Sequence, residues 1–341
     1  LRFHPSQSCV RGFPLTPKNC YAILKSKNTR INKLAIYHCS TKTISRSSGR
    51  SSVAASAYRA GEKLEDERTG LVHDFTRKDG VMYTTIISNI DIPLSRREVW
   101  NLAEQVENRK DARTAREWVV ALPEELNDDQ RRDLAKTFAK SLVDRYGVIA
   151  DLAIHAPSEK GDQRNFHAHI MLTTRKASVG QDNQLILGEK SEIELSNAKR
   201  ATLGLSKTQD DIKEIRQMWA DQANKALVHA MIRETIDHRS YADQNSELQP
   251  TVHEGSEVTQ LRRRGINTEI SLKNDQIKQD NLKIILNDRY GSYMEQRSEM
   301  VQQKFDHWKN QKEMKEKQNF EQEQKQQELE RSNSPNRGFS L

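Results

Sequence analysis

The sequence has 341 residues and a mass of 39.3 kDa; 35% of its residues are hydrophobic, 30% are charged, and its mean hydropathy is −0.87. This length suits one or two domains, and the polar composition predicts a folded part accompanied by long solvated segments. No apolar run is long enough to span a bilayer, which predicts a soluble protein without membrane insertion. Three cysteines without a CxxC pair exclude a disulfide framework and a zinc ribbon.

The net charge of +7 is concentrated near the N-terminus. Residues 1–61 contain eleven Lys or Arg residues and no acidic residue, whereas the remaining 280 residues carry 44 basic and 48 acidic groups. Basic residues interleaved with Ser, Thr and Gly are typical of a surface that binds a phosphate backbone. A disordered basic tail is an equal alternative for residues 1–33 and a weaker one for residues 40–59. The residues expected to contact DNA are Lys42, Arg46, Arg50 and Arg59.

Strands and helices alternate along the first half of the chain. Residues 1–33 have no clear periodicity and are expected to form a disordered basic extension. A helix at 51–64 is capped by Ser51 or Ser52, and the helix at 127–147 stops at Gly147. In chain order the expected elements are a strand at 35–44, a helix at 51–64, a strand at 82–88, a helix at 95–110, a strand at 115–123 and a helix at 127–147.

Two alternating strands then carry three histidines. His155 lies on one face of the segment 148–157, and His167 and His169 share one face of the segment 165–172 because strand side chains alternate with period two. A polar turn between the segments predicts a β-hairpin, which makes part of the sheet antiparallel and favours an α+β fold. The three imidazoles would then converge, although a register slip of one residue would turn His155 to the opposite face.

The second half of the chain is less regular. A helix is expected at 210–234, and from about 269 to 331 the sequence is rich in Lys, Glu and Gln with sparse apolar residues, which predicts a solvated helix or weak coil without a sustained heptad. The expected division is a basic extension at 1–33, a catalytic domain at 34–255 and a charged arm at 256–341 with a disordered end.

Three features together indicate phosphoryl transfer. The basic, Ser-rich loop can bind phosphate, Tyr58 follows it on a helix of small residues, and three imidazoles can bind a divalent metal that neutralises charge on a phosphate. A tyrosine hydroxyl can attack phosphorus to form a phosphotyrosyl bond. Each feature has a simpler explanation by itself, since Tyr58 could pack at the border of its helix and the histidines could be ordinary polar residues of a half-buried strand.

The segment AIYHCSTKTISRSSGRSSVAASAYRAGEKLEDERTGLVHDFTRKDGV, followed by AREWVVALPEEL and NFHAHIMLTTR, closely resembles the N-terminal domain of MobA/MobL-type conjugative relaxases, especially the TraA-like ones. The resemblance covers about residues 34–255. It implies the HUH fold, a central antiparallel sheet flanked by helices. It also implies an enzyme that nicks and rejoins one DNA strand at a plasmid transfer origin through a 5′-phosphotyrosyl intermediate.

The resemblance also assigns residues and partners. It implies Tyr58 as nucleophile, His155, His167 and His169 as ligands of Mg²⁺ or Mn²⁺, and Glu117 as an acidic residue that assists the metal or acts as a base. A surface glutamate on an edge strand is the alternative for Glu117. Plasmid DNA, single-stranded at the nick, is the implied substrate, with accessory relaxosome proteins and a secretion coupling protein as partners in the bacterial cytoplasm.

Two departures from the family pattern leave the extent of the protein open. Leu34 stands where the family usually begins with Met, and the TraA-like members continue into a helicase domain. The chain is therefore expected to be either a short mobilisation relaxase or a remnant of a longer one. The functional alternatives are a rolling-circle replication initiator or transposase with the same chemistry, a DNA-binding regulator that no longer cleaves, and a zinc hydrolase, for which an HExxH motif is missing.

Overall fold

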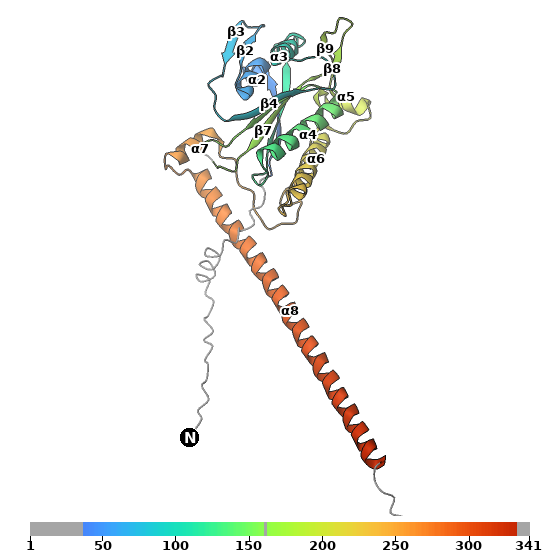
Figure 1. The fold of residues 1–341 in the computed structure, drawn as a ribbon. Coiled ribbons are helices and arrows are strands. Elements are labelled where there is room, and N and C mark those ends of the chain that lie inside the picture. Colours follow the sequence, from blue (N-terminus) through green and yellow to red (C-terminus); the bar gives the residue numbers. More distant parts are fainter. Residues whose placement is uncertain (1–36, 160–161, 333–341) are drawn as a thin grey trace, which may run out of the picture. The chain divides into compact units, whose positions relative to one another are not determined.

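The structure is a computed structural model that describes residues 37–159 and 162–332 (Figure 1). The expected extension at 1–33, Leu34 and the end of the chain after residue 332 lie outside the described residues. The chain divides into two compact units, Leu1–His238 and Arg239–Leu341. Within the described residues, no helix is both long and apolar enough to cross a membrane.

A five-stranded antiparallel sheet forms the centre of the first unit, with the strand order β1-β5-β7-β6-β4. This sheet and the flanking helices confirm the α+β class and the antiparallel architecture expected from the sequence. The five strands are β1 (Cys39–Ser45), β4 (Val81–Ile87), β5 (Arg113–Ala121), β6 (Ala150–His155) and β7 (His167–Thr173).

Two hairpins and five helices complete the described part of this unit. The hairpins pair β2 (Lys63–Asp66) with β3 (Leu71–Asp74), and β8 (Arg175–Val179) with β9 (Leu185–Lys190). The helices are α2 (Ser52–Ala60), α3 (Arg96–Gln105), α4 (Asp128–Tyr146), α5 (Asn197–Thr202) and α6 (Thr208–His229), with 3-10 turns at Arg46–Ser48 and Glu192–Glu194.

Each face of the central sheet has its own hydrophobic core. On one face, Trp118, Leu152 and Ile170 pack with Phe138 of α4 and Trp219 of α6. On the other face, residues of opposite parity along the same strands pack beneath α2 and α3; these are Ile44, Ala115, Ile149 and Met171, with Val53, Ala57, Val99 and Trp100 from the helices. Strand alternation therefore assigns each side chain to one of two different environments.

Local signals set most helix ends. Asn127 and Gln130 form a capping box at the start of α4, and Gly147 ends it in the left-handed conformation with φ 65°. The predicted end of the helix at 51–64 is wrong: α2 ends at Ala60 because Gly61 adopts φ 67°, and Leu64 belongs to β2. The helix expected at 210–234 likewise ends earlier, at His229.

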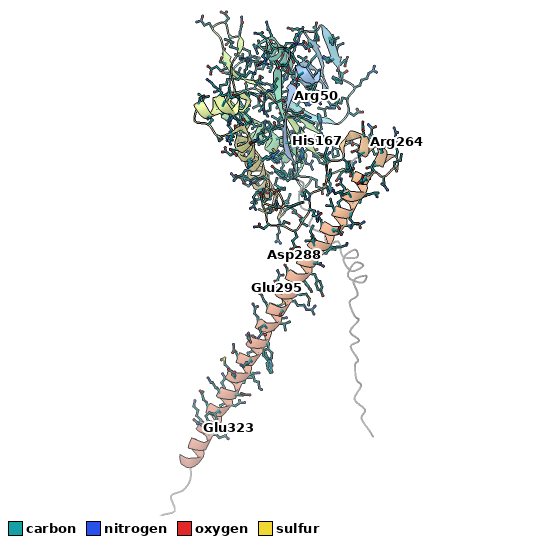
Figure 2. The ribbon with its side chains drawn as sticks, turned by 180° about the vertical axis from the view of Figure 1, so that it is seen from behind. Arg50, His167, Arg264, Asp288, Glu295 and Glu323 are labelled. Carbon is teal, nitrogen blue, oxygen red and sulfur yellow. The ribbon has the colours of Figure 1, made fainter. Side chains whose placement is uncertain are left out.

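The second unit contains α7 (Gly255–Arg263) and α8 (Glu269–Ser332), the latter a single helix of 64 residues. Side chains project from α8 along its length, among them Glu295 and Glu323 (Figure 2). Its aromatic residues Phe305, Trp308 and Phe320 are more than half exposed.

Candidate functional site

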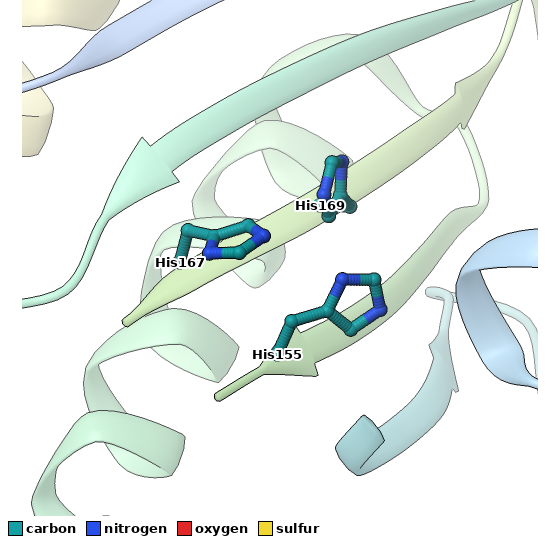
Figure 3. A group of neighbouring side chains, drawn as sticks. All are labelled: His155, His167 and His169. Carbon is teal, nitrogen blue, oxygen red and sulfur yellow. The ribbon is translucent and has the colours of Figure 1, made fainter. Parts of the chain in front are cut away.

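Three histidines converge on the sheet face that carries α2 and α3. In the β6–β7 ladder His155 pairs with His167, and Ala153 pairs with His169, so all three rings lie on one face. The rings point toward one another from the two strands (Figure 3), with centroids 4.9 to 5.3 Å apart. One nitrogen from each ring lies within 4.8 Å of the other two. The hairpin and its register are therefore as the sequence predicted.

Hydrogen bonds fix which nitrogen of each ring carries the proton. His155 donates from Nε2 to the carbonyl oxygen of Arg59 at 2.7 Å, and His167 donates from Nδ1 to the carbonyl oxygen of Asn165 at 2.9 Å. His169 donates from Nδ1 to the Glu117 carboxylate at 2.6 Å. Because these oxygens can only accept, the opposite nitrogen is the one that carries the lone pair in the neutral ring, which is the form that binds a metal.

Electrostatics keep this cluster neutral. Burial lowers the pKa of His155 to about 4, with nearby cationic groups adding to the effect, and burial also lowers the pKa of His169. Two of the rings are therefore uncharged at neutral pH. Three imidazoles with one nitrogen each directed to a common point match the donor set of divalent metal sites that also bind a substrate oxygen, so the cluster can hold a metal ion.

Glu117 supports the cluster from the neighbouring strand β5. This strand is hydrogen-bonded to β1 on one side and β7 on the other, and the Glu117 side chain is fully buried, so the alternative of a surface glutamate on an edge strand is wrong. Its carboxylate forms ion pairs with Arg59 and with Lys42, in addition to the bond from His169. Burial would raise the pKa of Glu117, but the bonds from His169 and Arg59 hold it well below its usual value. A carboxylate with so low a pKa can orient its hydrogen-bond partners but is a poor base.

Tyr58 lies on α2, whose ends are defined by local contacts. Ser51 caps the N-terminus by accepting a hydrogen bond from the backbone of Ala54, and Gly61 ends the helix. The Tyr58 side chain is 49% exposed although Val53 and Ala57 of the same helix are fully buried. Its ring packs edge-on against Phe75, with centroids 5.2 Å apart, and the Nζ atom of Lys78 lies 3.9 Å from its centroid.

The last carbonyls of α2 connect this helix to the histidine cluster. A helix leaves its final carbonyl oxygens without partners in the helix. The oxygen of Tyr58 accepts a hydrogen bond from Lys78 Nζ at 2.8 Å, and the next one, on Arg59, accepts the bond from His155. The residue that follows Tyr58 is thus bonded directly to a candidate metal ligand.

A buried carboxylate anchors the same helix to β6. Asp151 accepts hydrogen bonds from Ser56 at 2.6 Å, from Trp100 at 2.9 Å and from Arg96 at 2.9 Å. Ser56 precedes Tyr58 by two residues, and Asp151 lies on the strand and the face of His155. This network joins α2, α3 and β6, and it determines how the helix sits on the sheet.

The four basic residues expected to contact DNA divide into two kinds. Arg46 is anchored by Glu104 and by the backbone of the segment 104–109, and Arg59 is occupied by Glu117; their side chains are only 11% and 14% exposed. These two arginines therefore make contacts within the protein and are not free cations on its surface. Lys42 is half-exposed beside Glu117, and the guanidinium of Arg50 has no ion-pair or hydrogen-bond partner within the described residues.

A surface hollow of about 350 Å³ lies beside Tyr58. Lys42, Arg50, Ser51 and Arg59 line it together with Tyr58. Cations, a hydroxyl group and an exposed phenol around one hollow provide the groups that a phosphodiester requires. The structure thus brings Tyr58, Lys42 and Arg50 to one surface, next to the helix end that contacts His155.

Sequence reasoning missed two residues of this arrangement. Asp151 alternates in phase with His155 along β6, which could have identified an acidic residue on the active face. Lys78 lies in the turn after β3, and no local pattern distinguishes it from Arg77 beside it. Its position depends on the turn in which its backbone donates to the carbonyl of Phe75.

Comparisons with known proteins agree with this arrangement. The family model described as MobA/MobL family matches residues 50–264. The mobilization protein MobL of Acidithiobacillus ferridurans is 40% identical over 253 residues, which cover 68% of this chain and 65% of that protein. The conjugal transfer protein TraA of Rhizobium radiobacter is 31% identical over 277 residues, which cover 74% of this chain and 25% of that protein.

A solved structure shares the fold. It comes from work on the molecular basis of vancomycin resistance transfer in Staphylococcus aureus, and it aligns with a TM-score of 0.50 and 28% identity over 61% of this chain and all of the solved chain. The chain spans 65% of the MobL relative and a quarter of the TraA relative. Because the family model covers more than half of the sequence, the chain belongs to the MobA/MobL family.

Proposed function

We propose that this protein is a conjugative relaxase that nicks and rejoins one strand of plasmid DNA at a transfer origin. The observation that carries the proposal is the hydrogen bond from His155 to the carbonyl of Arg59, which joins the helix of the exposed Tyr58 to a cluster of three imidazoles that could hold a metal ion. Relatives named for mobilization and conjugal transfer support this function over rolling-circle replication or transposition.

In this proposal Tyr58 is the nucleophile. Its oxygen attacks the scissile phosphorus, the bond from phosphorus to the 3′ oxygen breaks, and the proton of the phenol is balanced by the proton that the leaving 3′ oxygen takes up. The products are a 5′-phosphotyrosyl bond and a free 3′-OH. Attack by that 3′-OH reverses the reaction and rejoins the strand.

The other residues bind and orient. Lys42 and Arg50 line the hollow and contact the phosphate backbone, while Arg46 and Arg59 position the loop and the helix from within the protein. His155, His167 and His169 would hold Mg²⁺ or Mn²⁺, and such an ion neutralises charge on the non-bridging phosphate oxygens. Glu117 keeps His169 in the metal-binding tautomer.

The proposal extends to the partners of the reaction. The substrate is plasmid DNA that is single-stranded at the nick, and accessory relaxosome proteins and a coupling protein of a conjugative secretion system would deliver and receive it. A DNA-binding regulator without cleavage is less well supported, because Tyr58 is exposed and one nitrogen from each of the three imidazoles lies within 4.8 Å of the other two.

The test uses supercoiled DNA that carries the plasmid's own intergenic region. With Mn²⁺ or Mg²⁺ we expect nicked circles with protein attached covalently to the 5′ end, and primer extension then maps the nick site. Tyr58→Phe removes only the hydroxyl, so DNA binding should survive while the adduct disappears. A 3′-linked adduct, or an adduct in Tyr58→Phe, would refute the assignment of the nucleophile.

The metal assignment has its own test in the same assay. A variant with both His167→Ala and His169→Ala should lose nicking but retain duplex binding, because backbone contacts come from the basic hollow and not from the imidazoles. Nicking by this variant in EDTA would show that the histidines do not act through a metal.

A further inference from the structure

Lys78 makes two contacts with Tyr58, and no role described so far explains the contact with its ring. Its ammonium group lies 3.9 Å from the centroid of the phenol ring and donates a hydrogen bond to the Tyr58 carbonyl at 2.8 Å. The turn that carries Lys78 also carries Phe75, whose ring forms a T-shaped pair with the same ring. One short segment thus makes two contacts with the Tyr58 ring.

A cation at this position acts differently on the two forms of tyrosine. A positive charge over an aromatic face is attracted by the π electrons, and in a phenolate the negative charge of the oxygen is shared with the ring. The attraction therefore grows as the oxygen gains negative charge. Burial, together with repulsion from Arg59, lowers the pKa of Lys78 to about 8, so the ammonium group stays mostly protonated at neutral pH.

We infer that Lys78 is a positioning residue for the nucleophile, and that it stabilises the phenolate character of Tyr58 in the transition state of cleavage. This inference rests on the proposed function, because it takes Tyr58 as the attacking group. The step itself is unchanged: the Tyr58 oxygen bonds to phosphorus, the 3′ oxygen leaves, and Lys78 neither gains nor loses a proton.

The ring contact, not the carbonyl contact, carries this effect. A hydrogen bond to a helix carbonyl is an ordinary helix-ending contact and a neutral donor can provide it. The charge over the ring cannot be replaced by a neutral side chain. The two contacts can therefore be separated by substitution at one position.

Three variants separate them. Lys78→Met removes both the charge and the donor, Lys78→Gln keeps a donor without the charge, and Lys78→Arg keeps a cation that can lie on the ring. Arg77→Met is the matched control, because Arg77 is an exposed neighbouring cation outside the described site. The substrate is a single-stranded oligonucleotide that carries the nick site mapped on the supercoiled plasmid.

At saturating oligonucleotide we expect Lys78→Met and Lys78→Gln to form the adduct roughly 3- to 30-fold more slowly, because the attraction of the ammonium group to the ring is stronger in the transition state than for the neutral phenol. The reverse reaction also passes through phenolate character, so religation should slow by the same factor and the fraction of adduct at equilibrium should not change. Lys78→Arg should recover most of the rate. Arg77→Met should behave like the natural protein.

Other results would overturn the inference. These are rates in Lys78→Met within twofold of the natural protein, a Lys78→Gln variant as fast as Lys78→Arg, or a shifted adduct equilibrium. If Lys78→Met does not fold, as thermal unfolding would show, the comparison of Lys78→Gln with Lys78→Arg decides alone. An adduct in Tyr58→Phe would instead refute the proposed nucleophile, so the two failures are distinguishable.

Discussion

Single hydrogen bonds decide the chemistry of this site at the scale of the residue. The clearest case is Glu117, which binds the Nδ1 proton of His169 and so leaves Nε2 free to bind a metal. The same carboxylate pairs with Arg59, whose carbonyl oxygen accepts the bond from His155. One buried acid thus contacts one candidate ligand directly and is linked to a second through Arg59.

Replacing Glu117 by Gln tests this role. Glu117→Gln keeps the shape but removes the charge that fixes His169, so the affinity for Mn²⁺ should fall by about 10- to 100-fold, as is typical when such an outer partner is lost. Isothermal titration with Mn²⁺ measures this directly. The control Glu189→Gln changes an exposed residue on β9 and should leave the affinity unchanged. An unchanged affinity in Glu117→Gln would contradict the positioning role.

At the scale of elements, two polar contacts in the second half of α2 attach this helix to the sheet. Asp151 of β6 holds Ser56, and His155 of the same strand holds the carbonyl of Arg59. The fully buried side chains Val53 and Ala57 of the same helix pack into the hydrophobic core on this face of the sheet. The position of Tyr58 is therefore fixed relative to one strand.

Loss of the Asp151 contacts should loosen this attachment. Asp151→Asn leaves the largely buried Arg96 without one of its two carboxylate partners and should cost about 3 kcal/mol of unfolding free energy. Ser56→Ala should cost about 1 kcal/mol, the usual value of a lost hydrogen bond. Urea unfolding measures both. Asp182→Asn, in an exposed loop, should change stability by less than about 0.5 kcal/mol, and a similar result for Asp151→Asn would refute the anchoring.

At the scale of the whole molecule, the two units differ in how much apolar surface they bury. The unit that ends at His238 contains two hydrophobic cores, one on each face of its sheet. In α8, by contrast, Tyr293, Phe305, Trp308 and Phe320 are all more than half exposed. Helices owe most of their stability to packing of an apolar face, so α8 should open more readily than the sheet domain.

Limited trypsin digestion of the full chain tests this difference. Cleavage should begin at Lys and Arg residues of α8, and mass spectrometry should find a protected fragment that contains residues 37–238. The expected order follows from local opening, since proteases cut segments that unfold easily. A protected fragment that retains residues past 300 while the sheet domain is cut would contradict this prediction.

Local physics made much of this protein predictable from its sequence. Strand alternation placed His155, His167 and His169 on one face, and the hairpin between them set their register. Asn127 and Gly147 set the ends of α4 because capping depends on a few neighbouring residues. Gly61 carried the same kind of signal for α2, although the prediction extended the helix past it.

The pairing of charges was decided only by the tertiary structure. A count of basic residues treated Arg46, Arg50 and Arg59 alike, but Arg46 and Arg59 reach acids 58 residues further along the chain, and Arg50 does not. The hydrogen bond from Ser56 likewise reaches an acid on a distant strand, Asp151. The sequence carries the local periods and caps, whereas the partner of a buried charge depends on which distant elements pack together, and desolvation makes that choice energetically decisive.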